Sequence, residues 1–268
     1  MHFVFPIEMG DTGKKTESLD TTMTLGEHLE ELRLRLILSL IGLAVTVGVC
    51  LFFGTAVISF IERPYIEAMG KQARLQSLAP ADGFTSYMEI SVMTGVVLAS
   101  PWIFYQLWMF ISSGLYPQEK RYVYIATPFS AGLFVAGALF FVFIIAPVTL
   151  KFLVMFNKQI LGVDSNFTFQ NYVSFIAMMM LIFGLAFQTP IAIFFLVKTG
   201  LISIQAMTRS RKYVIFGIVI LAAIATPGSD AFSLFSLAIP LYLLFEAGIA
   251  LAKISERRAK SRRIAENT

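Results

Sequence analysis

The sequence predicts an all-α integral membrane protein with six transmembrane helices, and two observations support this prediction. Apolar residues make up 57% of the 268 residues, charged residues only 14%, and the mean hydropathy is +0.74. Soluble domains contain about 45–50% apolar residues. In addition, several uncharged tracts reach the roughly 20 residues that a helix needs to cross about 30 Å of hydrocarbon.

Four long uncharged tracts predict the first four spans. The tracts at 36–61, 90–118, 122–150 and 165–197 contain no Asp, Glu, Lys or Arg, and polar segments separate them. We place the corresponding helices, in chain order, at about 36–61, 87–113, 122–150 and 168–197.

Two shorter tracts predict the last two spans, at about 213–226 and 231–250. The sequence "TPGSD" at 226–230 separates them, and Pro-Gly followed by Ser and Asp is typical of a tight turn. The first of these tracts has 14 residues. A helix of that length covers about 21 Å, which is less than the hydrocarbon thickness. We therefore expect a hairpin of two short helices that thins the membrane locally.

The charge distribution predicts three regions and an orientation. Residues 1–22 form a polar N-terminal arm, 23–255 the membrane domain, and 256–268 a basic cytoplasmic tail. With six spans, 16 of the 21 Lys and Arg residues fall on the side of both termini. Positive residues concentrate in cytoplasmic segments, so we predict that both termini are cytoplasmic. The net charge of +4 is explained by this topology, and no nucleic-acid partner is expected.

The motifs of common enzymes are absent from the sequence. It contains no HExxH motif, no Cys/His spacing typical of a metal site, no intramembrane Ser-His pair and no P-loop. Cys50 is the single cysteine, and His2 and His28 lie outside the predicted spans. We therefore expect no enzymatic activity, no cofactor and no metal.

A secondary transporter of a small solute or ion is the alternative function. Such proteins usually show internal repeats and ionisable residues near the middle of the membrane. The span lengths show no internal symmetry, and the middle of the predicted spans offers mainly the neutral amide of Gln188.

A cluster of charges stands directly before the first apolar tract, in "GEHLEELRLRLILSL" at 26–40. Glu31 and Arg35 are four residues apart, a pair worth about 0.2–0.5 kcal/mol on a helix, and Glu30 and Arg33 are three apart. In one interpretation these charges only satisfy each other. In the other, Glu31 and Glu119, both at cytoplasmic ends of spans, receive a cationic ligand.

Four segments resemble the TatC family, the multispanning receptor subunit of the twin-arginine protein translocase. The resemblance covers roughly residues 23–255, with the segments in the family's order. They are "HLEELRLRL" at 28–36, "ASPWIFYQLWMFISSGLYPQEKR" at 99–121, "FGLAFQTPI" at 183–191 and "LAIPLYLLFEAGI" at 237–249.

The resemblance implies a receptor that binds signal peptides carrying consecutive arginines and organises the transport of folded proteins across the bacterial inner membrane. Transport would be driven by the proton-motive force, with TatA- and TatB-type single-span subunits as partners and with self-association in the receptor complex. Glu31 and Glu119 match the acidic positions that recognise the arginine pair. The neighbouring motif positions are Arg33, Phe110, Leu115 and Tyr116.

Further residues match other family positions. The resemblance implies that Pro64 and Pro101 shape the fold and that Asp230 contacts a partner. Glu246 is expected to have a structural role, paired with Lys253 or with a neighbouring helix. The remaining matches are departures: Gln188 stands where the family typically has a glutamate, which leaves a neutral intramembrane polar site, and Glu89 stands where a basic residue is common and is expected to be an exposed acid.

Overall fold

The protein is a bundle of long helices in the computed structural model, which describes residues 25–70, 75–115, 120–163, 167–225 and 231–266. Within these residues every named element is helical, which confirms the all-α prediction. In chain order they are α1 (Leu25–Phe52), α2 (Gly54–Ile61), α3 (Arg63–Met69), α4 (Asp82–Ser113), α5 (Lys120–Phe140), the π-helical η1 (Phe141–Ile145), α6 (Ala146–Phe156), the π-helical η2 (Asn157–Leu161), α7 (Phe169–Ala186), α8 (Thr189–Lys198), α9 (Ile204–Arg209), α10 (Arg211–Ala225) and α11 (Ala231–Glu266).

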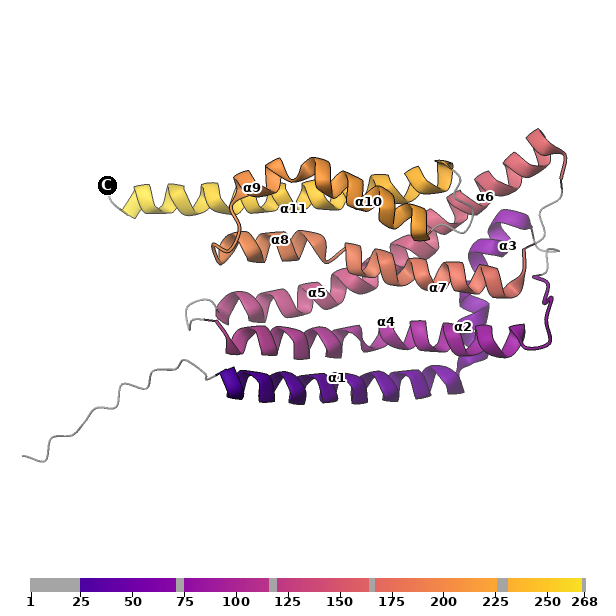
Figure 1. Ribbon diagram of the computed structural model, residues 1–268, viewed down its shortest axis with the longest axis horizontal. Helices are drawn as coiled ribbons and strands as arrows, with labels where there is room; N and C mark the ends of the chain where they lie inside the picture. Colours follow the sequence, from indigo (N-terminus) through magenta and orange to yellow (C-terminus); the bar gives the residue numbers. More distant parts are fainter. Residues whose placement is uncertain (1–24, 71–74, 116–119, 164–166, 226–230, 267–268) are drawn as a thin grey trace, which may run out of the picture.

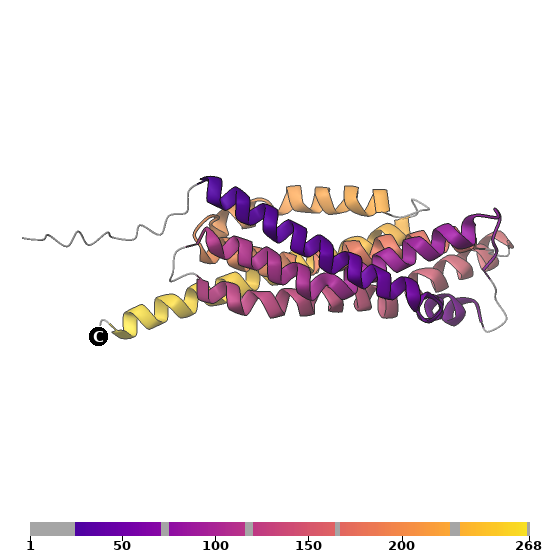
Figure 2. The ribbon, with the colours of Figure 1, turned by 90° about the horizontal axis from the view of Figure 1, so that it is seen from below.

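The long helices lie side by side, and each packs on only a few others (Figure 1). α1 packs on α4, which also packs on α5 and α7, whereas α8 and α10 pack on α11. We call the end of the bundle where α1 begins and α4 ends the proximal end, and the opposite end, where α2 and α3 lie, the distal end (Figure 2). The proximal end is the one that the charge distribution places in the cytoplasm.

Five helical stretches in the described part of the chain are long and apolar enough to cross a membrane, by length and composition. α10 is shorter, with 15 residues, or about 22 Å of helix. The fifth predicted span is therefore short, as expected from its sequence. That α10 crosses the membrane, that there are six spans and that both termini are cytoplasmic stay predictions. The five stretches are Gly26–Phe52, Asp82–Ser113, Lys120–Leu161, Phe169–Lys198 and Leu234–Arg257.

The stretch of the predicted first span, 36–61, is not one continuous helix, because α1 ends at Phe52 and α2 begins at Gly54. The Tyr87 hydroxyl of α4 donates a hydrogen bond to the carbonyl of Leu51, in the last turn of α1. The Tyr87 ring also occupies the space that a side chain at Gly54 would need. A helix end leaves carbonyl groups without partners inside the helix. A residue distant in sequence therefore stabilises a break that the apolar run does not reveal.

The helix that contains the last predicted span, 231–250, is longer than the span itself. α11 has 36 residues and extends to Glu266, so most of the predicted tail, 256–268, continues this helix. The segment after Gly248 contains no Gly or Pro as far as Glu266 and is rich in Ala, Lys, Arg and Glu. These residues have high helix propensity, so the helix continues beyond the apolar segment.

The two prolines that were expected to shape the fold occupy different positions in their helices. Pro64 is buried in the first turn of α3, where the missing N–H has no intrahelical partner to lose. Pro101 lies exposed inside α4, where it removes one backbone hydrogen bond from the helix. Their importance for the fold stays a prediction.

Aromatic rings and small residues form the contact between α5, η1 and α7. Phe141 and Phe183 are fully buried, and their ring centroids are 5.3 Å apart. Gly137 brings α5 close to α7, because a Cβ there would lie 2.6 Å from the carbonyl oxygen of Phe183. Lipid tails are as apolar as these side chains, so helices in a membrane associate through close packing more than through the hydrophobic effect.

We expect Gly137→Ala to destabilise the bundle by about 1–3 kcal/mol, because the added methyl group meets backbone that cannot move aside. Gly132→Ala is the matched control on the same helix, since its Cβ would meet nothing within 4 Å. Unfolding of both variants in detergent measures the difference. Equal stability of the two variants would contradict the close approach of α5 and α7.

Candidate functional site

The predicted site residue Glu31 lies where α1 and α4 meet at the proximal end. α1 starts from this end and α4 finishes there, so the first turns of α1 lie beside the last turns of α4 (Figure 1). His28, Glu31 and Arg35 are spaced by three and four residues, which places them on one face of α1. His28 and Arg35 contact side chains of α4, and Glu31 lies between them.

The guanidinium of Arg35 contacts two acceptors, one on each of the two helices. Its Nη1 donates to Oε1 of Gln106 at 3.0 Å, and its Nη2 lies 3.4 Å from Oε1 of Glu31. Among the residues that the structure describes, Glu31 Oε2 and Arg35 Nε are buried and have no hydrogen-bond partner. Glu30 and Arg33 are exposed, and the described part of the chain shows no ion pair between them. The charges of α1 therefore satisfy each other only in part.

Next to this pair, an aromatic contact joins the same two helices. The rings of His28 and Phe110 are stacked, with centroids 4.5 Å apart and an interplanar angle of 24°. Ser113 Oγ lies 3.3 Å from Nδ1 of His28. Of these residues, the sequence analysis selected only Phe110. The helical spacing of His28 from Glu31 could have indicated its place at the site.

Gln106 was also missed, and the sequence contains no signal for its contact. It is 2% exposed near the C-terminal end of the apolar helix α4, and 71 positions separate it from Arg35. Only the packing of α1 on α4 brings the two side chains together.

The other residues predicted at this site are only partly described. Arg33 is exposed on α1, and Leu115 is half-buried against the main apolar core just after α4. Glu119 and Tyr116 lie outside the described residues, as does Asp230, the predicted partner contact. Their roles stay predictions.

Gln188 lies at the break between α7 and α8. Its Nε2 donates to the carbonyl oxygen of Ser130 on α5 at 2.8 Å, and the hydroxyl of Ser130 accepts a hydrogen bond from Trp108 Nε1, also at 2.8 Å. The amide thus joins the break to α5. An ionised glutamate could not donate this hydrogen bond, so the neutral residue fits its surroundings. Its role as a polar site in transport stays a prediction.

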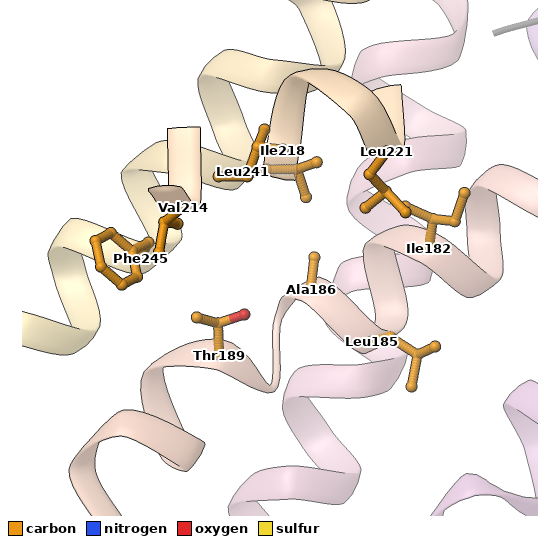
Figure 3. Close-up of a pocket in the computed structure, with 9 residues that line it drawn as sticks. All are labelled: Ile182, Leu185, Ala186, Thr189, Val214, Ile218, Leu221, Leu241 and Phe245. Carbon is orange, nitrogen blue, oxygen red and sulfur yellow. The ribbon is translucent and has the colours of Figure 1, made fainter. Parts of the chain in front are cut away.

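A cavity of about 320 Å³ lies beside this break, between α7, α8, α10 and α11 (Figure 3). Among the described residues that line it, Thr189 supplies the only polar side-chain atom, and Gln188 does not line it. The hollow next to Gln188 is therefore apolar. The lining residues are Ile182, Leu185, Ala186, Thr189, Val214, Ile218, Leu221, Leu241 and Phe245.

Glu89 is not the exposed acid that the sequence suggested. It lies in α4 and is half-buried, and its Oε2 accepts a hydrogen bond of 2.6 Å from the hydroxyl of Ser174 on α7. The packing of α4 on α7 brings together these two residues, 85 positions apart, and this pairing was invisible in the sequence.

Glu246 pairs with a neighbouring helix, one of the two arrangements expected for it. Nη2 of Arg211, at the start of α10, donates to Glu246 Oε2 at 2.8 Å, and its Nε lies 2.8 Å from Oε1. The Tyr242 hydroxyl donates to the same carboxylate at 2.9 Å. The two contacts of Arg211 hold α10 on α11, which supports a structural role for Glu246.

Long apolar helices, with charged and polar side chains gathered where α1 meets α4, define a multi-pass integral membrane protein. The model of the family "Sec-independent protein translocase protein (TatC)" matches residues 27–240. The chain belongs to the TatC family.

Individual relatives agree with the family model. A TatC from Aquifex aeolicus is 36% identical over 238 residues, which cover 89% of this chain and 98% of the relative. A TatC from Helicobacter pylori strain 26695 is 34% identical and covers 86% and 87%. A crystal structure of the twin arginine translocase receptor TatC has a TM-score of 0.78 and 35% identity and covers 86% of this chain and all of that one. The protein is thus a component of a protein translocase, a transport subunit that works with others.

Proposed function

We propose that the protein is the receptor of the twin-arginine translocation system and that Glu31 and Glu119 bind the arginine pair of the signal peptide. The observation that supports this proposal is that the Glu31 side chain is partly exposed and only partly paired. Its side chain retains 19% exposure at the proximal end of the bundle, and its Oε2, which is itself buried, lacks a hydrogen-bond partner among the described residues. A carboxylate with spare hydrogen-bonding capacity can accept an incoming guanidinium.

The chemistry of arginine explains how such a site selects it. A guanidinium presents a planar fork that pairs with a carboxylate through two hydrogen bonds, whereas the ammonium of lysine acts as a point charge. Each hydrogen bond to a charged group contributes about 1.5–3 kcal/mol. The residues of the peptide next to the arginine pair would contact four neighbouring side chains, those of Arg33, Phe110, Leu115 and Tyr116.

Membership of the family supports our proposal for the wider function. The receptor lies in the bacterial cytoplasmic membrane, with the proximal end in the cytoplasm, where signal peptides arrive. It self-associates and assembles with TatA- and TatB-type single-span subunits, and the proton-motive force drives the transport of folded proteins. Asp230 contacts one of these partners, and Gln188 forms a neutral polar site within the membrane.

Binding of a labelled twin-arginine signal peptide to the purified protein in detergent tests the proposal. We expect saturable binding of the arginine peptide and at least tenfold weaker binding of a twin-lysine peptide with the same apolar segment, since a tenfold change equals about 1.4 kcal/mol. The lysine peptide controls for net charge and hydrophobicity. Equal affinity for both peptides would contradict recognition of the guanidinium.

A further inference from the structure

Arg35 lies beside Glu31 and carries the same guanidinium that the receptor is proposed to recognise. Two contacts determine where this guanidinium lies: the hydrogen bond to Gln106, at 3.0 Å, and the ion pair with Glu31, at 3.4 Å. Hydrogen bonds between a charged nitrogen and a carboxylate are usually about 2.7–2.9 Å long. The pair with Glu31 is therefore loose, although the two residues are well spaced on the helix.

The polar atoms without partners show what a tighter pair would look like. Among the described residues of this site, Arg35 Nε and Glu31 Oε2 are buried and make no hydrogen bond. A carboxylate that pairs fully with a guanidinium uses both oxygens and two nitrogens of the fork. Nε and Oε2 are the atoms that such a pair would add to the existing contact of Nη2 with Oε1.

Gln106 explains why this full pair does not form. Its side chain is 98% buried in α4, so the packing around it holds its carbonyl oxygen in one place, and this oxygen accepts Nη1 of Arg35. The bond draws the guanidinium toward α4 and away from Glu31. Without this acceptor, the partner that Arg35 can reach at the lowest cost in free energy is the carboxylate of Glu31, one turn away on the same helix.

We propose that Gln106 is a positioning residue, which keeps Arg35 from pairing fully with Glu31 and so leaves the carboxylate available for an arginine of the signal peptide. Arg35 is then an internal competitor of the ligand, and Gln106 weakens that competition without touching the peptide. This inference rests on the proposed receptor function.

Peptide affinity of the full-length protein in detergent tests the proposal. In Gln106→Leu the acceptor is lost, Arg35 pairs fully with Glu31, and the affinity for the twin-arginine peptide falls about 3- to 10-fold, the effect of roughly one hydrogen bond. Gln106→Glu keeps an acceptor for Arg35 and binds at least as tightly as the unchanged protein. Ser100→Ala, which removes another buried polar group from α4, leaves the affinity unchanged.

The double variant separates positioning from a general loss of structure. In an Arg35→Met background no competitor exists, so the addition of Gln106→Leu has no further effect on affinity. An equal loss from Gln106→Leu in both backgrounds overturns the proposal, because the residue would then act only on the fold. An unchanged affinity in Gln106→Leu alone overturns it as well.

A parallel measurement on Glu31→Ala distinguishes this inference from the proposed function. If Glu31→Ala loses binding while Gln106→Leu does not, the receptor site stands and only the role of Gln106 is refuted. If Glu31→Ala binds like the unchanged protein, the proposed site itself is refuted.

Discussion

Replacing Glu31 with alanine is expected to lower the affinity for a twin-arginine signal peptide by about 10- to 100-fold. This loss corresponds to roughly one charge-assisted hydrogen bond to the ligand, worth about 1.5–3 kcal/mol, since every 1.4 kcal/mol changes the affinity tenfold. The fold should persist, because Arg35 retains its hydrogen bond to Gln106. Titration of the labelled peptide against the purified variant measures the loss, and combination with Glu119→Ala should remove specific binding.

Glu30→Ala is the matched control for this experiment. Glu30 is the adjacent residue in sequence, carries the same charge and is exposed. Its removal changes the net charge by the same amount and should alter the affinity less than about fivefold, since solvent-exposed ion pairs contribute about 0–1 kcal/mol. If both variants lose the same affinity, the effect comes from the general negative potential and Glu31 has no special position.

Replacing Phe183 with alanine is expected to cost about 2–4 kcal/mol of stability. The side chain is fully buried against Phe140 and Phe141, and its loss leaves a cavity between α5, η1 and α7. In water-soluble proteins such a change costs about 3–5 kcal/mol. The value here is lower because lipid or detergent also solvates the ring when the helices separate, so that mainly close packing is lost.

Leu185→Ala provides the control for this prediction. Leu185 lies on the same helix and is 55% exposed, so truncation removes few packing contacts. The free energies of unfolding of the two variants, measured in the same detergent, should differ by most of the roughly 2–4 kcal/mol expected for Phe183→Ala. Similar transitions for the two variants would mean that the contact between α5 and α7 contributes little to the stability of the bundle.

The sequence was a good guide to the membrane character of this chain, because hydropathy depends only on local composition. The long uncharged tracts coincide with helices, and the turn signals separate α10 from α11. The helix ends were predicted less well. Tyr87 caps α1 from another helix and divides the predicted first span, and the charged residues after 255 prolong α11. Apolar character and helix length are different properties, and only the first can be read directly from composition.

The sequence and the three-dimensional structure identified different residues of the candidate site. The motif around Glu31, together with the family resemblance, identified the acid, and its helical spacing identified the pair with Arg35. Nothing in the sequence indicated that Gln106 holds Arg35, or that Ser174 binds Glu89 and the Ser130 carbonyl binds Gln188.

The sequence by itself determined that this protein is an all-α membrane protein of the TatC family with a carboxylate before its first apolar helix. Only the tertiary structure decided which polar groups share that site and which atoms stay unpaired. The physical reason is that composition and helical period act over a few residues. By contrast, hydrogen bonds between helices depend on the packing of segments that lie 58 to 85 positions apart in the chain.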